Sequence, residues 1–200
     1  MNLHQEDKDR LSDFYGEALK KHGPHSPRAL RWISTQNQTA RFSILCRVGE
    51  LSGSSILDVG SGVGDLLPFI SERFYNVDYL GIDILPEMVR QARLKYHAGK
   101  FWSQDVSDIG AEFDYVLASG ALTFTISAGR QFYYEMIAKM FGLAKKAVAF
   151  NMLDASMQAS DGEFLAYDRR EVAEVCRKLT PNYRISADYE LGDFTVFLFK

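Results

Sequence analysis

The 200-residue sequence contains only two cysteines, Cys46 and Cys176, which lie far apart and form neither a CxxC spacing nor a cluster with histidine. This scarcity predicts neither a disulfide framework nor a metal site. We expect both thiols to be buried as small apolar side chains in a reducing compartment.

Long hydrophobic runs and runs of like charge are also missing. No stretch approaches the roughly 18 apolar residues of a membrane helix, and residues 1–10 are polar and acidic, unlike a secretion signal. The formal net charge of -3 gives no field that would attract a polyanion. We therefore expect a cytoplasmic protein without membrane contact, and nucleic acid is disfavoured as a partner.

The sequence contains enough apolar residues to bury one sizeable core. Hydrophobic residues make up 46% of the chain and charged residues 24%, and the length is that of one ordinary domain. No internal repeat or Pro/Ser-rich linker divides the chain. We expect a single domain, with a helical N-terminal segment at residues 1–50 and a core at residues 51–200.

Helices are expected in the N-terminal segment. Residues 7–21 carry apolar side chains at helical spacing, and Gly23 then ends this pattern. Ser26 and Pro27 are typical of an N-cap followed by a first-turn proline. A second helical stretch is therefore expected to run in pieces to Glu50.

Beyond residue 50 the pattern alternates between short apolar strands and helices. Strands are expected at residues 56–59, 78–82, 100–104, 113–118, 147–152, 183–190 and 194–199. Helices are expected at residues 66–74, 86–96, 129–143 and 169–179. This order predicts an α/β three-layer (α/β/α) sandwich with a seven-stranded, mostly parallel sheet that ends in an antiparallel hairpin.

A glycine-rich turn follows the first expected strand. Gly60, Gly62 and Gly64 come directly after it and precede a helix, where absent side chains let a nucleotide-like ligand approach the backbone. The dinucleotide fingerprint GxGxxG requires glycine or alanine three positions after Gly62, but Asp65 stands there. Asp58 and Asp65 would both repel a pyrophosphate.

The run at residues 57–64, LDVGSGVG, and the order of elements over about residues 50–200 resemble the class I S-adenosylmethionine (SAM)-dependent methyltransferase family, in particular small bacterial-type members of unassigned substrate. The resemblance implies SAM as the methyl donor and S-adenosylhomocysteine (SAH) as the product. SAM carries a cationic sulfonium and ammonium and no phosphate, which agrees with the two acids of the turn. The alternatives for a turn of this kind are a dinucleotide-dependent oxidoreductase and a structural turn without a ligand.

The next acid along the chain is a candidate for ribose binding. Asp83 follows Gly60 by 23 positions, close to the roughly 20 at which an acid meets ribose hydroxyls in nucleotide-binding units. The alternative is an acid that favours the helix dipole near Pro86. Ile84 and Met88 are expected to flank the adenine, unless they are ordinary core residues.

The resemblance supplies further contacts. It implies that Asp105 binds the adenine amino group beside the Val106 amide, with Asp108 as a competitor in register, and that Ser119 borders the methionine part. The predicted cofactor-binding residues are Asp58, Gly60, Ser61, Gly62, Gly64, Asp83, Ile84, Met88, Asp105, Val106, Ser119 and Arg41.

Residues 119–122 read Ser-Gly-Ala-Leu, whereas enzymes that methylate amino groups of nucleic acids usually carry Asn/Asp-Pro-Pro-aromatic at this point. The Pro-Cys nucleophile of enzymes that attack a pyrimidine ring carbon is also missing. DNA methylation is therefore disfavoured.

Methyl transfer is an in-line displacement that depends mainly on placing the nucleophile in a dry pocket. A general base is needed only if the acceptor must lose a proton. Tyr15 and His25 are the weak catalytic candidates, with His22 and Asp154 beside them, and each can equally be structural.

The N-terminal segment is expected to act as a lid over cofactor and acceptor. Tyr15, Trp32 and Phe42 could form aromatic walls, and Arg28, Arg31 and above all Arg41 could bind a carboxylate of SAM or of an acidic substrate. The alternative is that the rings pack on the sheet and the arginines face solvent.

The long connection at residues 151–168 could supply the second half of the acceptor site. It contains Met152, Met157, Phe164 and Tyr167, and a plain surface loop is the alternative. Altogether the sequence predicts methyl transfer from SAM to O, N or S of a small molecule. The alternatives are a SAM-binding regulatory or scaffold protein and a protein methyltransferase.

Overall fold

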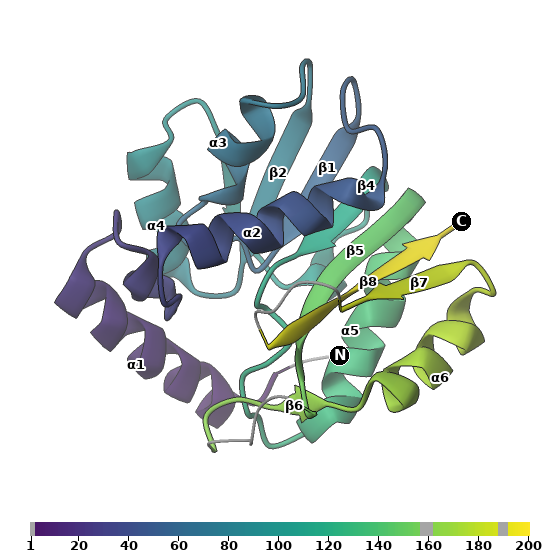
Figure 1. Cartoon of the computed structure of the whole chain (residues 1–200). Coiled ribbons are helices and arrows are strands. Elements are labelled where there is room, and N and C mark those ends of the chain that lie inside the picture. The colour runs from purple at the N-terminus through teal and green to yellow at the C-terminus, as the bar shows by residue number, and fades with distance from the viewer. Residues whose placement is uncertain (1–2, 157–161, 188–191) are drawn as a thin grey trace.

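The computed structural model describes residues 3–156, 162–187 and 192–200 (Figure 1). Its strands are β1 (Ser55–Val59), β2 (Asp78–Asp83), β3 (Lys100–Ser103), β4 (Phe113–Ala118), β5 (Ala144–Asp154), β6 (Ala166–Tyr167), β7 (Tyr183–Ser186) and β8 (Asp193–Phe199). Its α-helices are α1 (Gln5–His22), α2 (Thr35–Leu45), α3 (Leu66–Ser71), α4 (Pro86–Lys95), α5 (Gly129–Leu143) and α6 (Arg169–Leu179). Short 3-10 helices are η1 (Pro27–Leu30), η2 (Cys46–Val48) and η3 (Val106–Asp108).

The strands form one mixed sheet in the order β3-β2-β1-β4-β5-β8-β7, and β6 pairs with the end of β5. Strands β1 to β5 run parallel to one another, whereas β8 runs antiparallel to both β5 and β7. The predicted parallel sheet with an antiparallel C-terminal hairpin is confirmed.

Alternating residues of each strand are buried on opposite faces of the sheet. In β4, Val116 and Ala118 pack with α5 and α6, whereas Tyr115 and Leu117 pack with α2, α3 and α4. Figure 1 shows α2 across one face and α5 behind the other. The three-layer sandwich follows from this period of two, because both faces of a parallel sheet must be covered.

Several expected boundaries move. Strand β5 extends to Asp154, because β8 pairs with it as far as Leu153 opposite Asp193, so the start of the expected loop is strand. Strand β6 was not predicted, since two residues are too short for a periodic signal. Helix α3 ends at Ser71 rather than residue 74. Residues 188–190 of the last-but-one expected strand lie outside the described residues.

Helix α1 crosses the edge of the sheet where the parallel strands end (Figure 1). Its first turn is fixed there by Asp7, which is 2% exposed and accepts hydrogen bonds from the Ser127 amide at 3.1 Å and hydroxyl at 2.6 Å. The expected N-cap at Ser26 is present and accepts from the Arg28 amide, but it opens the 3-10 helix η1. Among the described helices, none is long and apolar enough to cross a membrane.

A buried ion pair joins α2 to β8. Arg41 and Asp193 are each 4% exposed, and the guanidinium meets the carboxylate through two hydrogen bonds, of which Nη2 to Oδ1 is 2.7 Å. Arg41 also donates to the Asn37 carbonyl at 3.0 Å. The pair thus connects the N-terminal segment to the start of the last strand.

A second buried acid lies inside the sheet. Asp58 of β1 is 2% exposed and accepts a short hydrogen bond from the Tyr79 hydroxyl on β2. Burial raises the pKa of Asp58 to about 7, although the bond from Tyr79 lowers it. The folded protein therefore binds this proton more tightly than an unfolded chain, in which aspartate titrates near about pH 4.

Replacing Asp193 with asparagine should lower the free energy of unfolding by about 3–5 kcal/mol, because the buried Arg41 guanidinium would lose its counter-charge. Urea unfolding measures this loss. The matched control is Asp78→Asn, which breaks the exposed pair with Lys100 and should cost no more than about 1 kcal/mol. Equal losses in both variants would contradict a structural role for the buried pair.

Protonated Asp58 stabilises the folded state, and this contribution is fully present below about pH 4 and is lost as the pH rises through about 7. Asp58→Asn cannot titrate. Its stability relative to wild type should therefore increase from about pH 4 to about pH 7, by at most about 1.4 kcal/mol per pH unit, and level off above that. Urea unfolding at several pH values tests this. In a Tyr79→Phe background, which lacks the hydrogen bond that lowers the Asp58 pKa, this increase should continue to a higher pH. If the difference in stability between Asp58→Asn and wild type does not vary with pH, the raised pKa is ruled out.

Candidate functional site

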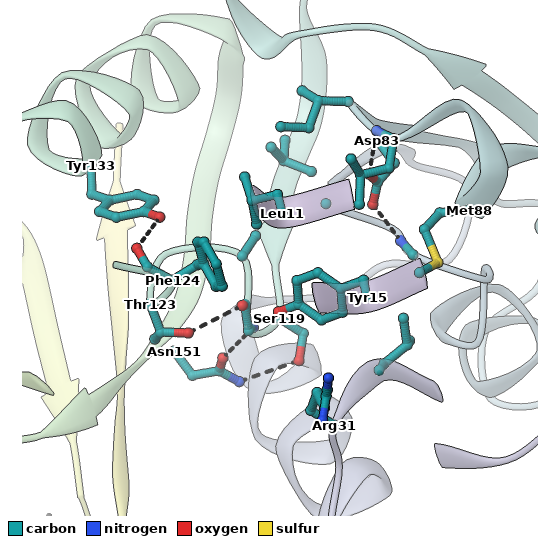
Figure 2. A pocket seen from close by; sticks show the side chains of 18 of the residues that line it. Leu11, Tyr15, Arg31, Asp83, Met88, Ser119, Thr123, Phe124, Tyr133 and Asn151 are labelled. Atoms are coloured by element: carbon teal, nitrogen blue, oxygen red, sulfur yellow. Dashed lines mark hydrogen bonds between the residues drawn. The ribbon is translucent and has the colours of Figure 1, made fainter. Parts of the chain in front are cut away.

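A cavity of about 470 Å³ opens where β1, β2, β4 and β5 end (Figure 2). This volume falls within the range of about 300–1,000 Å³ that is usual for small-molecule sites. Its lining comes from strand ends, from α1 and α5, and from the segment between η1 and α2. The polar and charged lining residues are Arg31, Asn37, Arg41, Asp83, Gln104, Asp105, Ser119, Thr123, Asn151 and Asp193, with the tyrosines Tyr15 and Tyr133.

The glycine-rich turn forms part of the floor. Gly60 and Gly62 have φ angles of 73° and 54°, in the region that favours glycine. A Cβ on Gly60 would lie 2.5 Å from the Cβ of Ala121, and one on Gly62 would lie 2.9 Å from the Leu30 side chain. The turn is thus packed between the β4 end and the N-terminal segment, with no room for a side chain.

The amide groups of this turn are used within the protein. The N–H groups of Gly60 and Ser61 both donate to the Ile82 carbonyl at 2.9 Å, and that of Gly62 donates to the Asp83 carboxylate at 2.8 Å. Three successive amides therefore point to β2 rather than to a ligand anion. A pyrophosphate bound at this turn would meet the Asp83 carboxylate instead of free backbone N–H donors.

Asp83 lies at the centre of this arrangement (Figure 2). Its Oδ2 accepts from Gly62 and its Oδ1 accepts from the Leu85 amide at 2.9 Å, so the side chain joins the turn to the start of α4. Burial raises the pKa of Asp83, although these backbone hydrogen bonds lower it. Each carboxylate oxygen has a further lone pair, and the pair can accept from two vicinal hydroxyls.

An apolar slot lies next to Asp83. Ile84, Met88 and Val106 line it, and Asp105 stands at its edge as the N-cap of η3, accepting from the Ser107 amide at 2.8 Å. The expected competitor Asp108 is exposed and does not line the cavity. A flat ring with an exocyclic amino group fits an apolar slot that ends in a carboxylate.

The turn after β4 is held by a residue that the sequence did not single out. Asn151 of β5 is 1% exposed, accepts from the Gly120 amide at 2.8 Å and donates to the Ser119 hydroxyl at 3.4 Å. The Trp32 ring lies on the other side, where a Cβ on Gly120 would be 2.9 Å away. A polar residue at the end of an otherwise apolar strand was the signal that could have identified Asn151.

Some predicted cofactor residues lie away from the cavity. Gly64 and Ser61 do not line it, and the buried Ser61 hydroxyl has no partner within the described part of the chain. Asp58 faces Tyr79 inside the sheet. Asp65 is paired with Lys95 and accepts from the Tyr96 hydroxyl at 3.0 Å.

The argument that Asp58 and Asp65 would repel a pyrophosphate is therefore wrong for this structure. Asp58 has a raised pKa and faces Tyr79 inside the sheet, Asp65 has a counter-charge, and neither lines the cavity. A pyrophosphate is instead disfavoured because the amides of the turn donate within the protein and because the Asp83 carboxylate lines the cavity.

Of the catalytic candidates, only Tyr15 lines the cavity. His25 is exposed and His22 lies outside the lining. Asp154 is engaged by Arg169 and by Ser156. Burial, with Asp83 nearby, raises the pKa of Tyr15, so its hydroxyl stays protonated and can only donate or accept as a neutral group. The described residues contain no cluster of histidine, cysteine and acids that could hold a metal ion.

The N-terminal segment contributes to the cavity in part as expected. Trp32 and Arg31 line it, whereas Phe42 packs against Phe69 and Arg28 is exposed. Arg41 lines it too, but its guanidinium is committed to Asp193.

The connection after β5 also contributes in part. Met152 and Phe164 line the cavity, whereas Tyr167 is buried and donates to the Leu122 carbonyl at 2.6 Å. Met157 lies outside the described residues.

Comparison with solved structures shows the same fold. The Burkholderia thailandensis 1,6-didemethyltoxoflavin-N1-methyltransferase, with 1,6-didemethyltoxoflavin and SAH bound, superposes with a TM-score of 0.69 at 18% identity over 100% of this chain and 91% of that chain. The magnesium protoporphyrin IX methyltransferase of Synechocystis PCC 6803, with bound SAH, gives a TM-score of 0.62 at 17% identity over 81% of each chain.

Sequence comparison gives the family. A sequence model described as a methyltransferase domain matches residues 56–142. The Mycobacterium tuberculosis protein Rv1506c, which is named as a methyltransferase, is 31% identical over 156 residues, a match that covers 73% of this chain and 93% of that protein. The chain therefore belongs to the class I SAM-dependent methyltransferase family.

Proposed function

We propose that this protein transfers a methyl group from SAM to O, N or S of a small-molecule acceptor inside the cavity at the ends of β1, β2, β4 and β5. The observation that carries the proposal is the Asp83 carboxylate, which joins the glycine-rich turn to α4 and offers its remaining lone pairs to the cavity. When bound, SAM would supply a methyl group on a positively charged sulfur. A nucleophile of the acceptor would attack the methyl carbon in line with the carbon–sulfur bond, and SAH would leave.

The residues around Asp83 support one placement of the cofactor. Asp83 would accept from the ribose hydroxyls, and Asp105 from the adenine amino group, with Ile84, Met88 and Val106 packing on the ring. The methionine part would then extend over Gly60 and Gly62 to the turn at Ser119. Ser61 and Gly64 would act by shaping the turn, and Asp58 by supporting its strand.

Arg31 is the better-placed partner for the cofactor carboxylate. Arg41 would have to share or break its buried ion pair with Asp193 to take that role. Arg31 lines the cavity, is exposed, and uses Nη2 for the Phe14 carbonyl at 2.7 Å, which leaves other N–H groups for a ligand. Its φ of 62° is unusual outside glycine, a conformation often retained at functional sites.

The N-terminal segment at residues 1–50 acts in this proposal as a lid over the core at residues 51–200. Tyr15 and Trp32 cover the space beyond the Ser119 turn, excluding water and orienting the acceptor. A cavity lined mainly by apolar side chains suits a small molecule better than a protein side chain presented on a surface. The toxoflavin methyltransferase, whose structure contains a small heterocyclic substrate, supports the same choice.

Calorimetric titration with SAM and SAH tests the cofactor site. Wild type should bind both, and Asp83→Asn should bind roughly 10- to 100-fold more weakly, since a hydrogen bond to a charged group is worth about 1.5–3 kcal/mol. Asp105→Ala should also weaken binding, whereas Asp108→Ala, three positions on and outside the cavity, is the matched control and should not. A folded wild type that binds neither ligand would overturn the proposal.

The role of Arg31 is tested with a cofactor fragment. Arg31→Gln should weaken SAH binding by about tenfold, because it removes a charge-assisted pair, and should leave binding of methylthioadenosine, which lacks the amino acid part, unchanged. Arg28→Gln, on the 3-10 helix η1 that Arg31 caps but outside the cavity, should have no effect. Equal weakening of both ligands by Arg31→Gln would show that Arg31 acts on the fold and not on the carboxylate.

A further inference from the structure

We propose that the acceptor is an uncharged, planar aromatic molecule that packs in an aromatic compartment of the cavity, which extends from Tyr15 to Phe124, away from Asp83 (Figure 2). Tyr15, Phe124 and Phe164 define this compartment, and Phe14 lies behind them. The inference rests on the proposed function, because it takes the Asp83 side of the cavity for SAM.

Phe14 braces the three lining rings. Its ring centroid lies 5.2 Å from that of Tyr15, 5.2 Å from that of Phe124 and 5.6 Å from that of Phe164. Tyr15 and Phe124 also lie 6.3 Å apart at an angle of 44°. These are edge and tilted contacts at favourable separations, so the compartment has an aromatic lining that is held from behind. A flat ring can join this cluster with the same kind of contact.

The backbone fixes the same wall. Phe124 and Phe164 form an antiparallel bridge, with hydrogen bonds from the Thr125 amide to the Glu163 carbonyl at 2.9 Å and from the Leu165 amide to the Thr123 carbonyl at 2.6 Å. Two segments about forty residues apart thus hold their rings in a fixed relation. A preformed wall favours a rigid ligand, because little ordering remains to be done on binding.

The charged groups around the cavity already have protein partners. Arg41 is paired with Asp193, Asp83 accepts from two backbone amides, and Asp105 accepts from Ser107. Arg31 donates to the Phe14 carbonyl and lies 4.0 Å from the centroid of the Phe14 ring. The remaining N–H groups of Arg31 and the remaining lone pairs of Asp83 and Asp105 are assigned to SAM in the proposed function. An acceptor with its own charge would therefore have to compete with the cofactor or with one of these protein partners, whereas an uncharged one would not.

The Tyr15 hydroxyl offers this compartment a neutral hydrogen-bonding group. Figure 2 shows Tyr15 in the middle of the cavity, between Leu11 and Ser119, and no described residue hydrogen-bonds to its hydroxyl. Because burial raises its pKa, this hydroxyl remains a neutral donor. It can hold a polar edge of the ring while the Ser119 turn, set by Asn151, borders the transferring methyl group.

Three probes of similar size separate the chemistry: naphthol, which is flat and uncharged; naphthoate, which is flat and anionic; and decahydronaphthol, which is uncharged but not aromatic. Each is titrated into the full-length protein saturated with SAH, with binding followed by calorimetry. Naphthol should bind roughly 2- to 10-fold more tightly than the other two, as expected for a few aromatic contacts. Phe164→Leu should remove this preference by weakening naphthol while leaving decahydronaphthol unchanged.

Tyr75→Leu is the control, since this ring is 74% exposed and lies outside the cavity. Equal binding of naphthol and decahydronaphthol, tighter binding of naphthoate, or no effect of Phe164→Leu would each overturn the inference while SAH binding still supports the proposed function. Failure of SAH to bind would instead overturn the proposed function and the inference with it.

Discussion

The Asp83 carboxylate holds together the two segments that form the floor of the cavity. One oxygen accepts from Gly62 in the turn after β1, and the other accepts from Leu85 where α4 begins. The partly buried Asp83 carboxylate requires hydrogen-bond donors. The Gly62 amide, which lies in the turn before α3, requires an acceptor outside that helix. Each group satisfies the other, and the two neighbouring strand ends are thereby fixed in relation to one another. The shape of the cofactor side of the cavity follows from this bond pair.

The same principle joins the less regular parts of the chain to the sheet. Buried or partly buried acids each meet a donor from a distant segment: Asp7 with Ser127, Asp65 with Lys95, Asp154 with Arg169 and Asp193 with Arg41. Isolated buried charges are costly, so such partners restrict how the segments can dock. The apolar side chains of α1 supply burial, and the hydrogen bonds between Asp7 and Ser127 fix where its first turn lies.

Apart from the two-residue β6, the order of strands and helices could be predicted, because each other strand has a short apolar run and each helix a periodic face, and neither depends on contacts far along the chain. Of Asp105, to which the family resemblance pointed, and its competitor Asp108, only Asp105 lines the cavity. What the sequence could not show is the direction in which an acid points. Asp58 and Asp65 belong to the same motif, yet their partners Tyr79 and Lys95 come from elements 21 and 30 residues away. Likewise, the pair between Arg41 and Asp193 spans 152 residues, so nothing near either residue indicates it.

The insertion of β8 between β5 and β7 has a consequence for how the protein is made. During synthesis the chain emerges from its N-terminus, so Arg41 leaves the ribosome long before Asp193 exists. Until the last strand has been made, the α2 guanidinium has no carboxylate to meet, and the open edge of β5 has no neighbour on that side. This connection between α2 and β8 therefore forms late, after the contact between Asp7 and Ser127 has become possible.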